Sequence, residues 1–388
     1  MIRANLDSVP IALANLLHNR KNLINALVGI AFAVLLMFMQ IGFLNALLDS
    51  TIQLLQVMDA DLFLVSKMTR SVIDNQEPFP KRRIFQAKGF SGVLSVDYLH
   101  IDNKVWKNPD TGYEKMMRIV AFDPKRSVFL NPEINLHLEN LKKNDTIIVD
   151  RLSKKLFGPI SKGINTEIEG KRFRVIGNFT LGTDFSARGT AMMSDSNYIN
   201  IFKDKDLVRA EDARIEIGLI KVIPGEDINL IASLLRREFA DDLIVLTKEE
   251  IVQKERTYWL EGTPVGFVFG LGTVMGFIVG IIICYQILFT DIMKRLNQFA
   301  TIKAIGYSNL YLTGTVIRQS LILATLGFFP GLILSHLIYQ AVSDWLHLPM
   351  NLGAAQTILI FGLTLIMSSI SGLIASRKVL AADPAELF

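Results

Sequence analysis

The sequence predicts a membrane α-helical protein with four transmembrane helices and a large α+β extracytoplasmic domain inserted between helices 1 and 2. Half of the 388 residues are hydrophobic, 20% are charged and the mean hydropathy is +0.35, which is high for a soluble chain of this length. Four long runs lack Asp, Glu, Lys and Arg. The basic residues outside these runs are unequally distributed between the segments that connect them.

Each uncharged run is long enough to cross ~30 Å of hydrocarbon, which takes about 20 helical residues. The runs extend over Asn22–Leu48, Gly262–Thr290, Gln319–Ser343 and Asn351–Ser376. The predicted segments are therefore an N-terminus at 1–21, transmembrane helices at 22–48, 262–290, 319–343 and 351–376, a large domain at 49–261, a connection at 291–318, a turn at 344–350 and a tail at 377–388. We interpret the first run as a retained anchor and not a cleaved signal peptide, because it exceeds the length of a signal h-region.

The basic residues predict which segments face the cytoplasm, since Lys and Arg near helix ends are retained on that side. Between Asp49 and Glu261 there are 32 Lys plus Arg and 32 Asp plus Glu, so this block is neutral. The nine other basic residues are Arg3, Arg20, Lys21, Lys294, Arg295, Lys303, Arg318, Arg377 and Lys378. They predict cytoplasmic termini, a cytoplasmic connection between helices 2 and 3, and an extracytoplasmic 49–261 block.

The 49–261 block is expected to fold as a domain. Apolar or alternating stretches typical of strands occur at Asp61–Ser66, Arg118–Phe122, Thr146–Val149, Phe173–Ile176 and Ile215–Val222, with turn residues between them. Ile228–Phe239 has helical spacing. The flanks Leu47–Met58 and Lys248–Tyr258 are expected to be helical stalks that continue into the first two membrane spans.

Sequence motifs for catalysis or metal binding are missing. There is no G-x-x-x-x-G-K-[ST] phosphate loop, so ATP hydrolysis is expected in a separate partner and the chain itself is not expected to be an enzyme. The single cysteine, Cys284, lies in an apolar run, and the five histidines lack metal-ligand spacing. No metal, cofactor or nucleic-acid partner is expected. The apolar runs hold no internal charge, which argues against an ion-coupled transporter.

Two features of the second span and the connection after it indicate function. Small residues recur at four-residue spacing at Gly262, Gly266, Gly270, Gly272, Gly276 and Gly280. Such spacing allows close helix approach, either within the subunit or between two subunits. The connection from Asp291 to Gly306 is predicted to be one amphipathic helix whose apolar stripe is Ile292, Leu296, Phe299, Ile302 and Ile305. A helix lying in the membrane interface is the alternative interpretation.

The order of these segments resembles the FtsX/MacB-type permeases of ATP-binding cassette (ABC) transporters. The loop Phe299-Ala-Thr-Ile-Lys-Ala-Ile-Gly-Tyr307 and the end Ala375-Ser-Arg-Lys-Val-Leu-Ala-Ala-Asp-Pro-Ala-Glu-Leu387 are similar to the corresponding phrases of that family. The segments Met58–Val65 and Thr146–Gly158 also fit. Within the family the sequence is most similar to the DevC-type permeases of cyanobacterial glycolipid exporters. Unlike MacB, it has no fused ATPase.

The resemblance implies a permease subunit in the inner membrane that transmits motion from a separate ABC ATPase, which would bind ATP and Mg²⁺, to the extracytoplasmic domain. It further implies a homodimer, a periplasmic adaptor, a TolC-like outer-membrane channel and export of a lipid or glycolipid. The predicted ATPase-coupling residues are Lys294, Arg295, Phe299, Ile302, Lys303 and Gly306. An FtsX-like regulator of an extracytoplasmic enzyme, or an exporter of lipoproteins, drugs or peptides, is the alternative.

Overall fold

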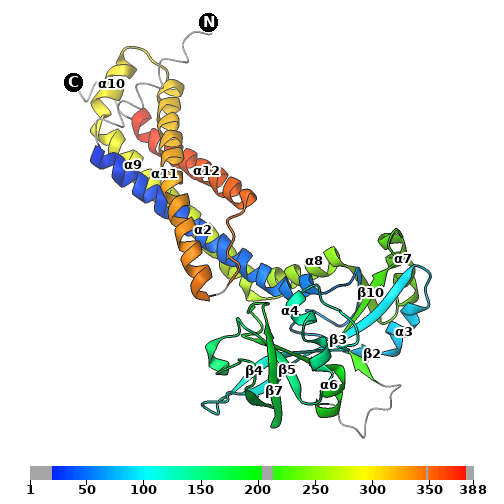
Figure 1. The fold of residues 1–388 in the computed structure, drawn as a ribbon. Coiled ribbons are helices and arrows are strands. Elements are labelled where there is room, and N and C mark those ends of the chain that lie inside the picture. Colours follow the sequence, from blue (N-terminus) through cyan, green and yellow to red (C-terminus); the bar gives the residue numbers. More distant parts are fainter. Residues whose placement is uncertain (1–19, 203–212, 347, 382–388) are drawn as a thin grey trace. The chain divides into compact units, whose positions relative to one another are not determined.

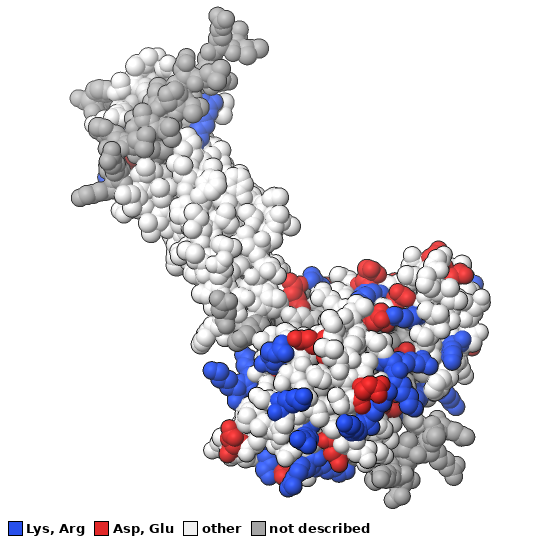
Figure 2. All heavy atoms as spheres, in the orientation of Figure 1, with Lys and Arg blue, Asp and Glu red and all other residues white. Residues whose placement is uncertain are grey.

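The computed structural model describes residues 20–202, 213–346 and 348–381, which form two compact units. The sheet domain is Leu47–Pro264, and the helical bundle takes the residues before Leu47, Val265–Leu346 and the residues from Met350 onward. Predicted features at Arg3, Lys205 and 382–388, and the side chain of Lys378, lie outside the described residues. Figure 2 shows that charged residues are spread over the sheet domain, whereas the visible surface of the bundle is almost free of them.

The described residues of the bundle form four long helices and one short one (Figure 1). The long helices are α2 (Arg20–Val57), α9 (Pro264–Lys294), α11 (Asn309–Leu346) and α12 (Ala354–Ala381), and the short helix is α10 (Leu296–Ala304). All four long helices are apolar and long enough to cross a bilayer, which agrees with the predicted fold class. Because helical geometry persists beyond the uncharged runs, α2 extends to Val57 and α11 begins at Asn309 instead of Gln319.

The sheet domain is built on a nine-stranded sheet in the order β11-β1-β10-β3-β4-β8-β5-β7-β6. Its strands are β1 (Leu62–Ser66), β3 (Val93–Lys107), β4 (Glu114–Phe122), β5 (Thr146–Asp150), β6 (Asn165–Ile168), β7 (Lys171–Phe179), β8 (Thr190–Ser194), β10 (Ile217–Val222) and β11 (Leu243–Thr247). The long strand β3 also pairs with β6, through Trp106 opposite Ile168. This second pairing closes six strands, from β3 through β4, β8, β5 and β7 to β6, into a ring.

Short elements cover the sheet. A second, two-stranded sheet joins β2 (Phe79–Pro80) to β9 (Arg214–Ile215). The helices are α3 (Arg82–Lys88), α4 (Pro132–Asn135), α5 (Leu138–Leu141), the 3₁₀ turn η1 (Lys155–Phe157), α6 (Asp195–Phe202), α7 (Ile228–Glu238) and α8 (Lys248–Glu261). The predicted strands are present as β1, β4, β5, β7 and β10, and the predicted stalk helices as the end of α2 and as α8. The strands β2, β3, β6, β8 and β11 were not predicted.

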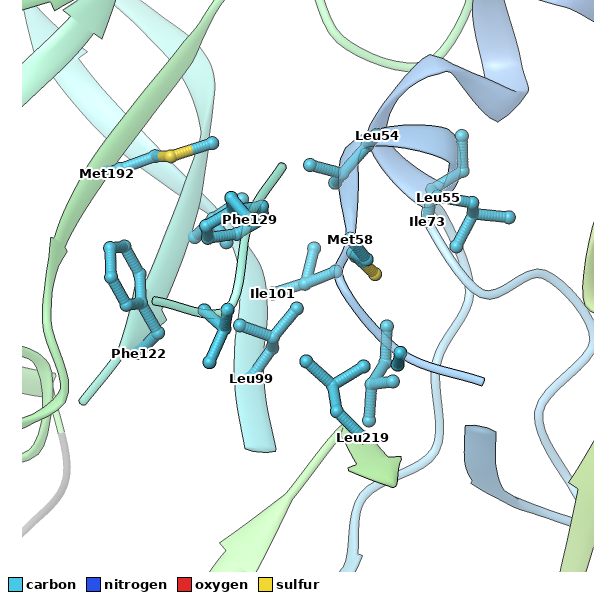
Figure 3. Close-up of a cluster of buried hydrophobic side chains, with 14 of the residues drawn as sticks. Leu54, Leu55, Met58, Ile73, Leu99, Ile101, Phe122, Phe129, Met192 and Leu219 are labelled. Atoms are coloured by element: carbon cyan, nitrogen blue, oxygen red, sulfur yellow. The ribbon is translucent and has the colours of Figure 1, made fainter. Parts of the chain in front are cut away.

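Three apolar cores hold the domain together. The first receives the end of α2, where Leu54, Leu55 and Met58 join Leu99 and Phe122 of the sheet in one cluster. Figure 3 shows Met58 between the helix end and Leu99, and Leu55 beside Ile73. The second lies under α3 and α7, and the third fills the ring around Trp106. Because α2 supplies fully buried residues to the first core, this stalk is part of the domain and not a flexible tether.

Candidate coupling site

Glycines and other small residues set the packing of the bundle. A methyl group added at Gly327 or Gly331 of α11 would lie 2.7 Å from Ile30 or 2.8 Å from Val34 on α2. Gly42 of α2 likewise leaves room for the ring of Tyr339. Such positions bring helix backbones close enough for extensive van der Waals contact, which is the main attraction between helices in lipid.

The predicted glycine rows of α9 have different surroundings. A Cβ on Gly272 would lie 2.5 Å from Gln40 and one on Gly276 would touch Met37, while Gly280 faces Met367 of α12. This row therefore packs inside the chain. Gly270 is exposed with open space beside it, Gly266 is half-buried, and Gly262 lies before α9, where it caps α8. Gly262 is consequently not part of the predicted packing row within the second span.

Polar side chains add specific links between the helices. The Tyr339 hydroxyl donates to the Phe38 carbonyl of α2 and accepts from Nε2 of Gln356, 2.9 Å away on α12. Ser371 of α12 donates to the Ile281 carbonyl of α9 at 2.8 Å. In hydrocarbon each such bond satisfies a polar group that water cannot reach, and contributes about 0.6 to 2 kcal/mol.

The connection between α9 and α11 is not the single helix predicted for Asp291–Gly306. Helix α9 continues to Lys294, Arg295 leaves helical geometry at φ −115° and ψ 14°, and α10 runs from Leu296 to Ala304. Arg295 is held by an ion pair with Asp291 at 3.3 Å, and Gln319 of α11 donates to the same carboxylate at 2.6 Å. The break divides the predicted apolar stripe, because Ile292 is buried within α9.

Helix α10 ends in a glycine turn that reverses the chain into α11. Gly306 has φ +102°, a conformation that costs a residue with a Cβ but not glycine. The Tyr307 N–H donates back to the Ile302 carbonyl at 3.4 Å, as in a glycine-capped helix end. The predicted helix stop at Gly306 is confirmed.

The exposed apolar surface of the connection lies at this turn. Phe299, Ile302 and Lys303 are half-buried, and Lys294 is exposed. The α10–α11 corner, which we define as Ile305, Tyr307 and Leu310, has exposed fractions of 72%, 50% and 85%. Sequence reasoning included Ile305 but missed Tyr307 and Leu310, because both fall after the glycine and off the helical stripe.

The two stalk helices are joined to one another in the sheet domain. Arg256 of α8 forms an ion pair with Asp49 of α2. Lys248 donates to the carbonyls of Gln56 and Met58, at 2.9 and 2.8 Å, at the end of α2. A cation is favourable there because the helix C-terminus carries partial negative charge. The two stalk helices are therefore linked at two places, through Lys248 and Arg256 of α8.

A buried carboxylate ties α8 to the loop that follows β1. Glu255 is fully buried and accepts from Ser71 Oγ at 2.6 Å, the Val72 N–H at 2.7 Å and Trp259 Nε1 at 2.9 Å. Burial raises the pKa of Glu255, while these donors act in the opposite direction. Within the described part of the chain no group of three or more His, Cys, Asp or Glu side chains could hold a metal ion.

Comparison with known families gives a match to part of the bundle. Residues 270–384 match the family model described as FtsX-like permease C-terminal. The match includes most of α9, the α10–α11 corner, α11 and α12. A search of the curated proteins gives no match.

Three solved structures are similar to about half of the chain. The periplasmic region of MacB from Actinobacillus actinomycetemcomitans has 12% identity and a TM-score of 0.34, covering 51% of this chain and 92% of that one. The extracellular domain of the noncanonic ABC-type transporter YknZ from Gram-positive bacteria has 11% identity and a TM-score of 0.33, covering 49% and 100%. A domain of a putative permease from Porphyromonas gingivalis has 12% identity and a TM-score of 0.31, covering 48% and 86%.

Proposed function

We propose that this chain is the membrane-spanning permease subunit of an ABC exporter, and that it transmits motion from a separate cytoplasmic ATPase to the sheet domain. The observation that carries the proposal is the match of 270–384 to an FtsX-like permease, in a chain with four apolar helices long enough to span a membrane. The absence of a phosphate-binding loop from the sequence supports a separate ATPase.

The contacts support mechanical transmission. An ATPase that binds Lys294, Arg295, Phe299, Ile302, Lys303, Gly306 and the α10–α11 corner would displace α9 and α11 together, because Asp291 links them. The stalks α2 and α8 are in turn fixed to each other and to the sheet domain. No step in this scheme requires a charged residue within the membrane.

The remaining parts of the proposal concern the assembly and the substrate. We expect an inner-membrane homodimer with both termini cytoplasmic, working with a periplasmic adaptor and a TolC-like outer-membrane channel. The substrate class we favour is a lipid or glycolipid, as in the DevC-type exporters that the sequence resembles.

Reconstitution tests this function directly. The purified chain is expected to hydrolyse ATP only at background rate, and to bind and stimulate its ABC ATPase once that subunit is added. Mutation of the ATPase phosphate-loop lysine should abolish all turnover in the complex. Turnover by the chain alone, or failure of any ABC ATPase encoded beside it to bind, would contradict the proposal.

A further inference from the structure

A hollow of about 670 Å³ lies beside α8 in the sheet domain. Its lining includes Arg70, Glu250, Lys254, Tyr258, Glu261 and Gly262. Residues 250, 254, 258 and 261 are spaced by three or four positions, so they share one face of α8. The hollow therefore has one wall made by this helical face and an opposite wall contributed by the loop after β1.

The loop holds Arg70 in a fixed place. Its neighbours Thr69 and Ser71 are 2% and 0% exposed, and Ser71 donates to the buried Glu255 of α8 at 2.6 Å. The Glu77 N–H donates to Thr69 Oγ1 at 3.0 Å, which closes the loop. Because the flanking backbone is fixed on both sides, the exposed Arg70 side chain is presented to the hollow from a rigid base.

Several cations of the sheet domain are held in ion pairs. Arg118 pairs with Asp184, Arg236 with Glu250 and Arg256 with Asp49. Among the residues that the structure describes, neither Arg70 nor Lys254 forms an ion pair, although both line the same hollow. Two cations without an ion-pair partner favour an anionic ligand, and phosphate oxygens are strong acceptors for such donors. The carboxylates of Glu250, which pairs with Arg236, and of Glu261 belong to the same lining.

The position of the hollow in the chain indicates where that anion comes from. Gly262 caps α8, and the candidate span begins at Pro264. Tyr258 is only six residues before Pro264, a separation of ~9 Å for a continuous helix. The head-group layer on each side of the hydrocarbon is about 5 to 8 Å thick. Tyr258, which lines the hollow, is also a residue type that concentrates at membrane interfaces.

We propose that the α8 hollow binds the phosphate group of a membrane lipid head, with Arg70 and Lys254 as its cationic donors. The Glu261 carboxylate, at the membrane-proximal end of the hollow, suits the ammonium group of a zwitterionic head. This inference rests on the proposed function, because it requires α9 to cross the membrane. It adds a lipid site on the sheet domain that is separate from the coupling site.

Calorimetric titration of the full-length chain in detergent with monomeric dihexanoylphosphatidylethanolamine, whose head carries both a phosphate and an ammonium group, tests the site. We expect the Arg70→Ala/Lys254→Ala variant to bind this lipid at least about tenfold more weakly, since each hydrogen bond to a charged group contributes roughly 1.5 to 3 kcal/mol. The matched control is Lys88→Ala/Arg237→Ala, which removes two exposed cations of the same domain outside the hollow. Its affinity is expected to be unchanged.

Further arms identify the ligand and the role of charge. Arg70→Lys should retain most of the affinity for the lipid, because the positive charge is kept. Glycerol 3-phosphate should displace the lipid only weakly, because it lacks the rest of the lipid. Equal losses in the two double variants would indicate bulk electrostatics and overturn the site. Tight binding of free phosphate would overturn its assignment to a lipid. ATPase binding by the same variants should be normal. Failure of the unaltered chain to bind an ABC ATPase would refute the permease function, whatever the outcome of the lipid titrations.

Discussion

The α10–α11 corner should dominate binding of the ATPase. Leu310→Ala removes three carbon groups, worth ~2.4 kcal/mol if docking buries them fully at ~0.8 kcal/mol per group. Since Leu310 is 85% exposed, docking can bury most of this surface, and the expected loss is about 2 kcal/mol. The same reasoning for Ile305, which is 72% exposed, gives about 1.7 kcal/mol. Each substitution should therefore weaken ATPase binding at least about tenfold.

Phe299→Ala/Ile302→Ala is the matched comparison. The sequence predicts that these two side chains insert into the ATPase, but both are already half-buried in the bundle. Docking can bury less additional surface there, so their loss should weaken binding less than Ile305→Ala/Leu310→Ala does. Neutralising Lys294 should mainly slow association, because charges at the edge of an interface act on the on-rate.

Co-purification of the ATPase and its Kd for nanodisc-embedded permease are the measurements, after a check that each variant inserts normally. If Ile305→Ala/Leu310→Ala binds the ATPase with unchanged Kd, the corner is not a docking surface. If, in addition, charge reversal at Lys294 and Arg295 disturbs membrane placement, the connection is an interfacial helix and the coupling assignment is wrong.

Three further predictions address packing, topology and pH dependence. Gly280→Leu should destabilise the bundle, because the new side chain meets Ala33 and Met367. Gly270→Ala should be neutral or stabilise α9 by up to about 1 kcal/mol, because the space beside it is open. If thermal unfolding in detergent ranks the two variants in the opposite order, the packing assignment is wrong. In a Cys284→Ala background, cysteines replacing Lys143 or Lys205 should be labelled from outside the cell, and cysteines replacing Lys294 or Lys378 only from inside. Labelling of the residue-294 cysteine only from outside would refute the topology. Burial raises the pKa of Glu255 above 4.5. Protonation of Glu255 therefore adds to the free energy of unfolding fully below about pH 4.5, and this contribution is lost as the pH rises through the folded-state pKa. Glu255→Gln should remove this component from the pH profile of unfolding, and an unchanged profile would contradict the assignment.

The sequence by itself determined the features that depend on local composition. Uncharged runs long enough to cross a bilayer gave the four long helices, because length and hydropathy are properties of a segment alone. Alternation gave strands such as β5 and β10, and the glycine stop at Gly306 was readable because it requires positive φ. Strand β3 was missed since its Asp, Asn and Lys residues interrupt any simple alternation.

Only the tertiary structure decided which residues meet. The pairing of β3 with β10 and β6 joins segments far apart in the chain, and no local pattern specifies it. The regular glycine spacing in α9 could not distinguish Gly280, packed against α12, from the exposed Gly270. Likewise, the helical spacing of apolar residues in the sequence continues through Arg295, but in the structure the helix is interrupted there, and Arg295 forms an ion pair with Asp291. Contacts of this kind depend on what lies opposite each residue, which one sequence does not contain.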